Sequence, residues 1–204
     1  QTVPVIGTVE WQSNQQSIRV NSSLSPTNGN DALGMTYRNT ACGLNYTMVS
    51  NRLGRRFNPI GVLQPAPFVV AGIPQCASIL KAYLYTEALG VTPGINATIT
   101  SPQNVTTQVP MTLIGSSIDV CWGMNGTHVW RADVTSLITG AGLYMISGLP
   151  TSVHLPNAVD VEGATLLIIY QDPTATYTGT IQIDDGCHTV QGIPLSHAMQ
   201  GFAA

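Results

Sequence analysis

Charged side chains are scarce in this sequence. Asp, Glu, Lys and Arg make up 8% of the 204 residues, and the formal net charge is −3, whereas typical soluble domains contain roughly 25% charged residues. Lysine occurs once, at Lys81. Nucleic acid and anionic membranes are bound by clustered basic side chains, so the composition argues against both partners. A chain with so little charge needs another solvating layer or burial in an assembly.

Helical periodicity, long apolar runs and catalytic motifs are also missing. No run of about 20 apolar residues could span a bilayer as a helix, so we expect no membrane span. Only 134–138, with Asp133 as its N-cap, has the pattern of a helical turn. The chain contains no nucleophile elbow, P-loop or dinucleotide-binding glycine motif. We therefore expect a non-enzymatic protein without a cofactor, although a carboxylate pair assembled only in the fold would leave no such motif.

Cysteine is present in an even number with wide spacing, and no CxxC motif or Cys/His cluster indicates zinc. In an oxidising compartment the four cysteines would form two disulfides, with three connectivities open. Buried free thiols are the alternative. The cysteines are Cys42, Cys76, Cys121 and Cys187.

Five Asn-Xaa-Ser/Thr sequons offer the solvating layer that charge does not supply. Each could carry a solubilising glycan in a host that glycosylates secreted chains; chance occurrence is the alternative. The chain opens with Gln1 rather than Met, as a mature N-terminus does after signal removal, and a sequence that starts at an arbitrary boundary would look the same. We expect a secreted, cell-surface protein with glycans on some of these sites: Asn21, Asn45, Asn96, Asn104 and Asn125.

Strand signals fill most of the chain. Short runs rich in Val, Ile, Thr and Tyr alternate with clusters of Gly, Pro, Asn and Ser, as in a sandwich or barrel. The run 165–170 is apolar on both faces, which predicts a central strand covered on each side. The predicted fold class is an all-β, antiparallel β-sandwich of jelly-roll type over 25–204. The clearest strands are expected at 77–86, 95–101, 108–114, 118–122, 143–147, 164–170 and 178–183.

Residues 1–24 differ from the rest and are predicted to extend from the sandwich as a candidate donor strand. Alternation within 2–11 puts apolar side chains on one face of a strand. A polar break, a second short strand at 17–20 and a linker-like stretch at 22–31 follow. The face of the candidate donor strand is formed by Val3, Val5, Val9 and Trp11, with Gly7 completing it.

The histidines and one pair of aspartates are the residues that a metal site would use. Asp184 and Asp185 could contribute oxygen ligands to calcium, but a β-turn before Gly186 explains the pair more simply. The histidines lie in unlike contexts without the spacing of metal ligands, so we predict no metal site. They are His128, His154, His188 and His197.

Two tryptophans, one aspartate and a basic cluster allow both a binding and a structural interpretation. Trp122 and Trp130 could form a sugar-binding platform or belong to the core, which we favour. Asp133 could be a catalytic acid, but it fits better as a helix cap or as the partner of Arg131. The basic cluster is interpreted as a solvated loop or a subunit contact. It consists of Arg52, Arg55 and Arg56.

Three stretches share their order and spacing with a known module. They are 73–85 (IPQCASILKAYLY), 131–144 (RADVTSLITGAGLY) and 163–173 (GATLLIIYQDP), the last running on to the Asp-Asp-Gly at 184–186. Over about 51–185 the chain therefore resembles a β-sandwich domain of unknown function that recurs in bacterial and archaeal surface proteins. The resemblance implies a part of an adhesin, surface layer or appendage, and no catalytic motif transfers.

One departure from that family suggests how the chain assembles. Family members continue past the Asp-Gly turn with further strands, whereas only 187–204 remains here. A sandwich that lacks a strand leaves an open groove, which a neighbour's N-terminal strand would fill. Donor and acceptor on one chain make a head-to-tail homopolymer. We therefore predict a structural filament subunit; the alternatives are an N-terminal strand that pairs in its own domain, and a monomeric carbohydrate-binding or adhesive module.

Overall fold

The structure is a computed structural model that describes residues 16–17, 33–55, 61–90, 94–119, 123–151 and 159–187. Strands make up most of these residues, and a 3₁₀ turn, η1 (Thr135–Leu137), lies where the sequence predicts a helical turn. Within these ranges no helix has the length and apolar character needed to cross a membrane. The predicted division at residue 24 lies outside them. So do the following predicted site residues: Val3, Val5, Val9, Trp11, Asn21, Arg56, Cys121, Trp122, His154, His188 and His197.

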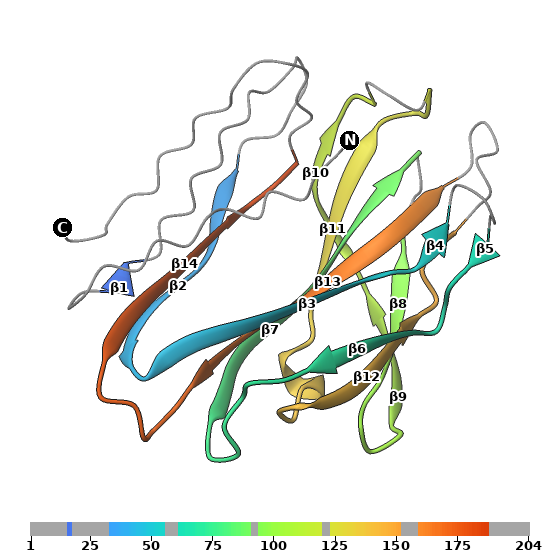
Figure 1. Ribbon diagram of the computed structural model, residues 1–204. Coiled ribbons are helices and arrows are strands. Elements are labelled where there is room, and N and C mark those ends of the chain that lie inside the picture. Colours follow the sequence, from blue (N-terminus) through green and yellow to red (C-terminus); the bar gives the residue numbers. More distant parts are fainter. Residues whose placement is uncertain are drawn as a thin grey trace.

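Two antiparallel sheets pack face to face as a β-sandwich (Figure 1). Their strand orders are β10-β11-β7-β13-β3 and β6-β12-β8-β9. The pairs are nested along the chain: β3 with β13, β6 with β12, β7 with β11, and β8 with β9. Nested antiparallel pairs divided between two sheets form a jelly roll, so the predicted fold class is confirmed. The strands are β3 (Leu44–Arg52), β6 (Ala66–Val70), β7 (Ser78–Leu89), β8 (Asn96–Thr100), β9 (Thr106–Pro110), β10 (Thr112–Ser117), β11 (Thr127–Asp133), β12 (Gly142–Ser147) and β13 (Asp160–Gln171).

The main hydrophobic core fills the space between the two sheets. Because successive side chains point to opposite faces of a strand, Leu166 and Ile168 of β13 enter this core and are fully buried. Phe68 and Tyr144 enter it from the opposite sheet. The Tyr144 hydroxyl donates to the carbonyl oxygen of Gly140 at 3.0 Å, so this buried polar group is satisfied.

A two-stranded ribbon adds a third layer. We call β2 (Gly34–Cys42) and β14 (Thr178–Asp185) the ribbon; they continue β3 and β13 and fold back over the outer face of the five-stranded sheet (Figure 1). The chain bends at Gly43, whose φ is 68° and where a Cβ would lie 1.9 Å from the Asp172 carbonyl oxygen. Only glycine fits such a position.

A second hydrophobic cluster holds the ribbon on the sheet. Leu44, Ile169 and Ile181 form its buried centre. At the far end of the ribbon, Cys187 lies against Gly115 of β10, where an added Cβ would come within 2.5 Å of the Cys187 nitrogen. Consecutive residues Ile168 and Ile169 are both fully buried, one in each cluster. The prediction that 165–170 is covered on both faces is confirmed.

Several strand predictions need correction. The predicted strand at 108–114 is broken at the buried Met111, where the chain passes from β9 in one sheet to β10 in the other. Ile118 and Asp119 of the predicted strand at 118–122 are outside any strand, and the rest of it is not described. No strand was predicted at β2, β3, β6 or β11. The remaining short strands are β1 (Gln16–Ser17), β4 (Gly54–Arg55) and β5 (Gly61–Val62).

Candidate functional site

An ion pair and its hydroxyl partners anchor the ribbon to the sandwich. Arg131 of β11 donates from Nη1 to Asp185 Oδ2 of β14. The Asp185 carboxylate also accepts from Thr36 Oγ1 of β2 at 2.7 Å and from the Tyr85 hydroxyl of β7 at 2.8 Å. The side chains of Arg131 and Asp185 are 23% and 13% exposed. Breaking such a pair leaves a poorly solvated charge, so this anchor fixes where the ribbon lies.

The ionisation of this anchor suits a structural tie rather than proton transfer. Burial, followed by the negative charge of Asp185, raises the pKa of Tyr85, so its hydroxyl stays protonated as a donor. Burial is the largest single influence and disfavours the Arg131 charge, but the hydrogen bond to Asp185, the charge of Asp185 and the contacts with Tyr85 together outweigh it, so the pKa of Arg131 is raised. Both donors therefore keep their protons at any physiological pH.

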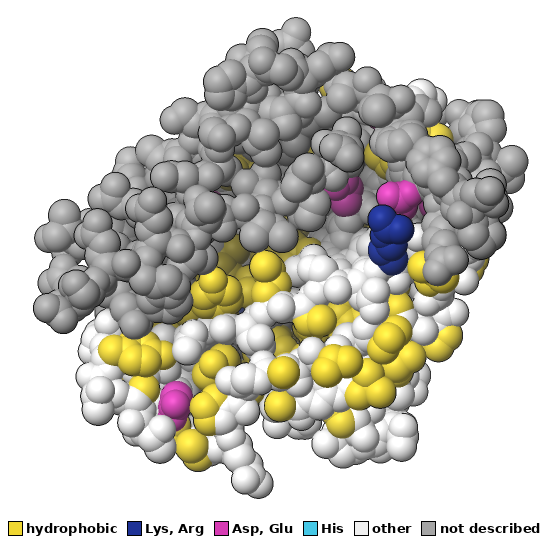
Figure 2. Space-filling model, in the orientation of Figure 1, with side chains coloured by type: hydrophobic (Ala, Val, Ile, Leu, Met, Phe, Trp, Pro, Cys, Tyr) yellow, Lys and Arg dark blue, Asp and Glu magenta, His cyan; other side chains and the backbone are white. Residues whose placement is uncertain are grey.

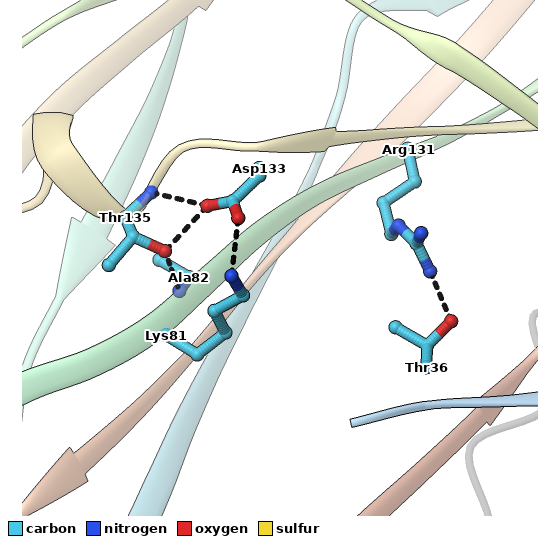
Figure 3. A network of polar contacts seen from close by, with 6 residues as sticks. All are labelled: Thr36, Lys81, Ala82, Arg131, Asp133 and Thr135. Atoms are coloured by element: carbon cyan, nitrogen blue, oxygen red, sulfur yellow. Dashed lines mark hydrogen bonds and ion pairs between the residues drawn. The ribbon is translucent and has the colours of Figure 1, made fainter. Parts of the chain in front are cut away.

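A second ion pair joins neighbouring strands of the five-stranded sheet (Figure 3). Lys81 Nζ of β7 donates to Asp133 Oδ2 of β11 at 2.5 Å. The other oxygen of Asp133 accepts from the Thr135 nitrogen at 3.1 Å and its hydroxyl at 2.6 Å, and Thr135 Oγ1 accepts from the Ala82 nitrogen at 3.0 Å. The cap interpretation of Asp133 is wrong, because the N-cap of η1 is Val134 and no side chain caps the turn. Asp133 instead binds Thr135 at the start of η1, and its ion partner is Lys81 and not Arg131.

Asp133 is a poor general acid or base at neutral pH. Burial alone would raise its pKa, but the bonds from Lys81 and Thr135 prevail and hold the pKa below the ordinary 3.8. The bond to Asp133 raises the pKa of Lys81 above 10.5. Both groups stay charged, so the pair acts as a cross-strand link.

The cations of the two ion pairs flank one aromatic ring. The centroid of the buried Tyr83 ring lies 5.5 Å from Lys81 Nζ and 5.1 Å from Arg131 Cζ. Tyr85 packs edge-on to it at 5.9 Å. Cations over an aromatic face are stabilising. Lys81, the only lysine in the sequence, therefore has a structural role on the surface of the five-stranded sheet.

The edge of the ribbon receives a strand from the N-terminal part of the chain. β1 pairs in parallel with β14, with Gln16 opposite Gly179 and Ser17 opposite Thr180. β14 is therefore the middle strand of a three-stranded sheet, β1-β14-β2. Added strands are held chiefly by main-chain hydrogen bonds, so this edge can accept an extended segment with little demand on its sequence.

The acidic and aromatic candidates lie in structural positions. Asp184 and Asp185 end β14, so the β-turn interpretation is wrong. In the described ranges no three His, Cys, Asp or Glu side chains gather as metal ligands would. Trp130 is 5% exposed and belongs to the core, as favoured, so it is not part of a sugar-binding platform.

The basic and histidine candidates lie on or beside strands. Arg52 ends β3 and Arg55 lies in β4, so the loop interpretation fails for both. His128 Nδ1 lies 2.8 Å from the Ser116 hydroxyl on the neighbouring strand β10. A cross-strand hydrogen bond explains this imidazole without a ligand.

The described cysteines show no cross-link between them. Cys42 and Cys76 are exposed free thiols that lie just before β3 and β7. The first residues of these two strands, Leu44 and Ser78, both pair with Gln171 at the end of β13, so the two cysteines lie at the same end of the sheet. Cys187 is buried, with its sulfur 3.6 Å from the Thr127 carbonyl oxygen. The predicted disulfides therefore remain a prediction.

The described sequons differ in accessibility. Asn96 begins β8 and is exposed, Asn104 is exposed in the turn between β8 and β9, and Asn125 is exposed before β11. Asn45 is half-buried within β3, where its Oδ1 accepts from the Tyr46 nitrogen at 2.8 Å.

Comparison with protein-family models, with curated proteins and with solved structures found no match for the chain. The molecule is thus described by its own architecture: an all-β sandwich of jelly-roll topology whose outer face carries an anchored ribbon, with β1 added at the β14 edge of that ribbon.

Proposed function

We propose that this protein is a structural subunit of an extracellular or cell-surface filament, built head-to-tail when each subunit donates its N-terminal strand to the next. The observation that carries the proposal is the parallel pairing of β1 with the edge of β14. In this pairing β1 adds a strand to the edge of the ribbon. β1 belongs to the N-terminal segment whose sequence also contains the alternating apolar face of Val3, Val5, Val9 and Trp11.

The geometry of this pairing makes exchange between subunits inexpensive. Gln16 and Ser17 run in the same direction as β14 and pair with it at Gly179 and Thr180. The same main-chain bonds form whether the strand comes from the same subunit or from a neighbour, which is the basis of domain swapping. Donation in one direction does not close on itself, and it produces a filament.

The remaining features are consistent with an extracellular subunit. Few charges and a sheet face without charge suit a protein covered by neighbours or glycans. We include disulfides and N-linked glycans in the proposal, and no catalytic role.

Electron microscopy tests the proposal on chain purified without denaturant. Uniform fibres are expected from the native sequence, and single particles from a variant with Val5, Val9 and Trp11 replaced by Ala. The matched control replaces Thr8 and Glu10, on the opposite face of the same strand, and should still polymerise. Fibres from the first variant would refute strand donation. Monomers of the native chain that are retained on immobilised glycans would favour the carbohydrate-binding module instead.

A further inference from the structure

The outward face of the four-stranded sheet carries no charge. On β6, β12, β8 and β9, side chains that alternate with the core residues point away from the sandwich, and none of them is Asp, Glu, Lys, Arg or His. We call this surface the uncharged face. Two ion pairs, by contrast, lie on the outer side of the opposite sheet.

Part of the uncharged face is strongly apolar. Val69 is 65% exposed and Leu143 is 50% exposed, and the two are cross-strand partners. Met145 and Pro67 form the next pair along the same two strands. Figure 2 shows hydrophobic side chains over the region of β6 and β12 with no charged side chain among them. Neighbouring apolar groups in water favour association of the chain unless something covers or solvates them.

Two exposed sequons adjoin this face. Asn96 alternates with the buried Ala97 and Ile99, so it points outward beside Thr98. Asn104 stands in the β8–β9 turn, with φ 61° and its nitrogen bonded to the Ser101 carbonyl oxygen at 2.9 Å. Glycans at both positions would extend from one edge of the uncharged face and from the tip of its hairpin.

Asn45 provides the contrast. It lies half-buried near the start of the edge strand β3, its Oδ1 accepts from the Tyr46 nitrogen, and its side chain bonds to Tyr177. A glycan on its Nδ2 would leave the Oδ1 contact in place, but it would compete with the Tyr177 contact and would need room beside a half-buried side chain. The folded structure therefore separates sequons that a motif search treats as equal.

We infer that Asn96 and Asn104 carry N-linked glycans that solvate the uncharged face. In the reaction the side-chain amide nitrogen attacks the anomeric carbon of a lipid-linked oligosaccharide and forms the new carbon–nitrogen bond. The carbon–oxygen bond to the lipid phosphate breaks, the lipid phosphate leaves with the bonding electron pair, and the proton lost by the amide passes to the solvent. The inference rests on the part of the proposed function that gives the secreted chain N-linked glycans, and it names their sites and their role. Filaments can form without the glycans, so the two proposals fail separately.

Glycopeptide mass spectrometry of the protein from its own cells tests site occupancy. A sugar mass is expected on the peptides containing Asn96 and Asn104 and not on the peptide containing Asn45. Unmodified Asn96 and Asn104 in the secreted protein would overturn the inference, as would a glycan on Asn45 alone.

Sequon variants secreted from a glycosylating host test the role of the glycans. Thr98→Val together with Thr106→Val removes both sequons, and we expect several-fold less soluble protein at equal expression. Thr98→Ser with Thr106→Ser keeps both sequons and should match the native chain. Adding Leu143→Thr to the valine pair should restore solubility. If the variant with both Thr→Val changes were as soluble as the native chain, the solvating role would be refuted. The same conclusion would follow if a second copy of the chain covered the uncharged face, which would be seen as a native dimer that Leu143→Lys dissociates.

Discussion

Replacing Ile169 with Ala tests the third layer of the fold. Ile169 is fully buried between β13 and the ribbon, in the cluster with Leu44 and Ile181. The change removes three carbons, worth about 0.8 kcal/mol per buried CH₂, and leaves a cavity, so we expect a loss of ~3 kcal/mol in the free energy of unfolding. Ile168→Ala, one residue away in the main core, should cost a similar amount.

Urea denaturation measures both losses, and hydrogen exchange separates them. Ile169→Ala should speed exchange chiefly in the ribbon strand β14, whereas Ile168→Ala should speed it throughout the sandwich. Leu143→Ala, at a side chain 50% exposed on the uncharged face, is the control and should change stability by less than about 0.5 kcal/mol. If Ile169→Ala were as mild as this control, the ribbon would not cover the sheet and the reasoning would be refuted.

Two further results are expected. Because the pKa of Asp133 is lowered in the folded protein, its contribution to stability is present above pH 3.8 and is lost as the pH falls through the lowered value; Asp133→Asn should cost less than about 1 kcal/mol at neutral pH, since the pair is partly exposed, and nothing in strong acid, as measured by urea denaturation over pH. In reduced, folded protein iodoacetamide should label Cys42 and Cys76 quickly and Cys187 only after unfolding; equal rates, followed by mass spectrometry, would contradict the burial of Cys187.

The strands with strong apolar patterns were predictable from the sequence. β7 and β13 are long, hydrophobic and covered on both faces, so local pattern and final environment agree. β2 was missed because it lies in the thin ribbon, where its side chains are at most half-buried and its sequence, GMTYRNTAC, is mostly polar. The nested pairing of distant strands follows from the packing of the whole chain and not from any local segment.

The polar contacts were harder to predict because their partners are distant in sequence. Arg131 and Asp133 share one face of β11, but residues two apart on a strand are separated by roughly 6.6 Å. Each side chain therefore pairs across to another strand, Arg131 with Asp185 and Asp133 with Lys81. The contact of β1 with Gly179 and Thr180 likewise joins segments about 160 positions apart, so the acceptor edge could not be located from the sequence.

Cysteine trapping tests strand donation most directly. Ser17 and Thr180 are register partners, and residues directly opposite each other in a sheet are close enough for a disulfide. One chain would carry Ser17→Cys and another Thr180→Cys, both with Cys42 and Cys76 replaced by Ser, and the two would be mixed during assembly and then oxidised. The account predicts a covalent dimer of the two chains, and a ladder of covalent polymers from a chain with both new cysteines. A doubly substituted chain that cross-links only within itself, with no dimer in the mixture, would contradict it.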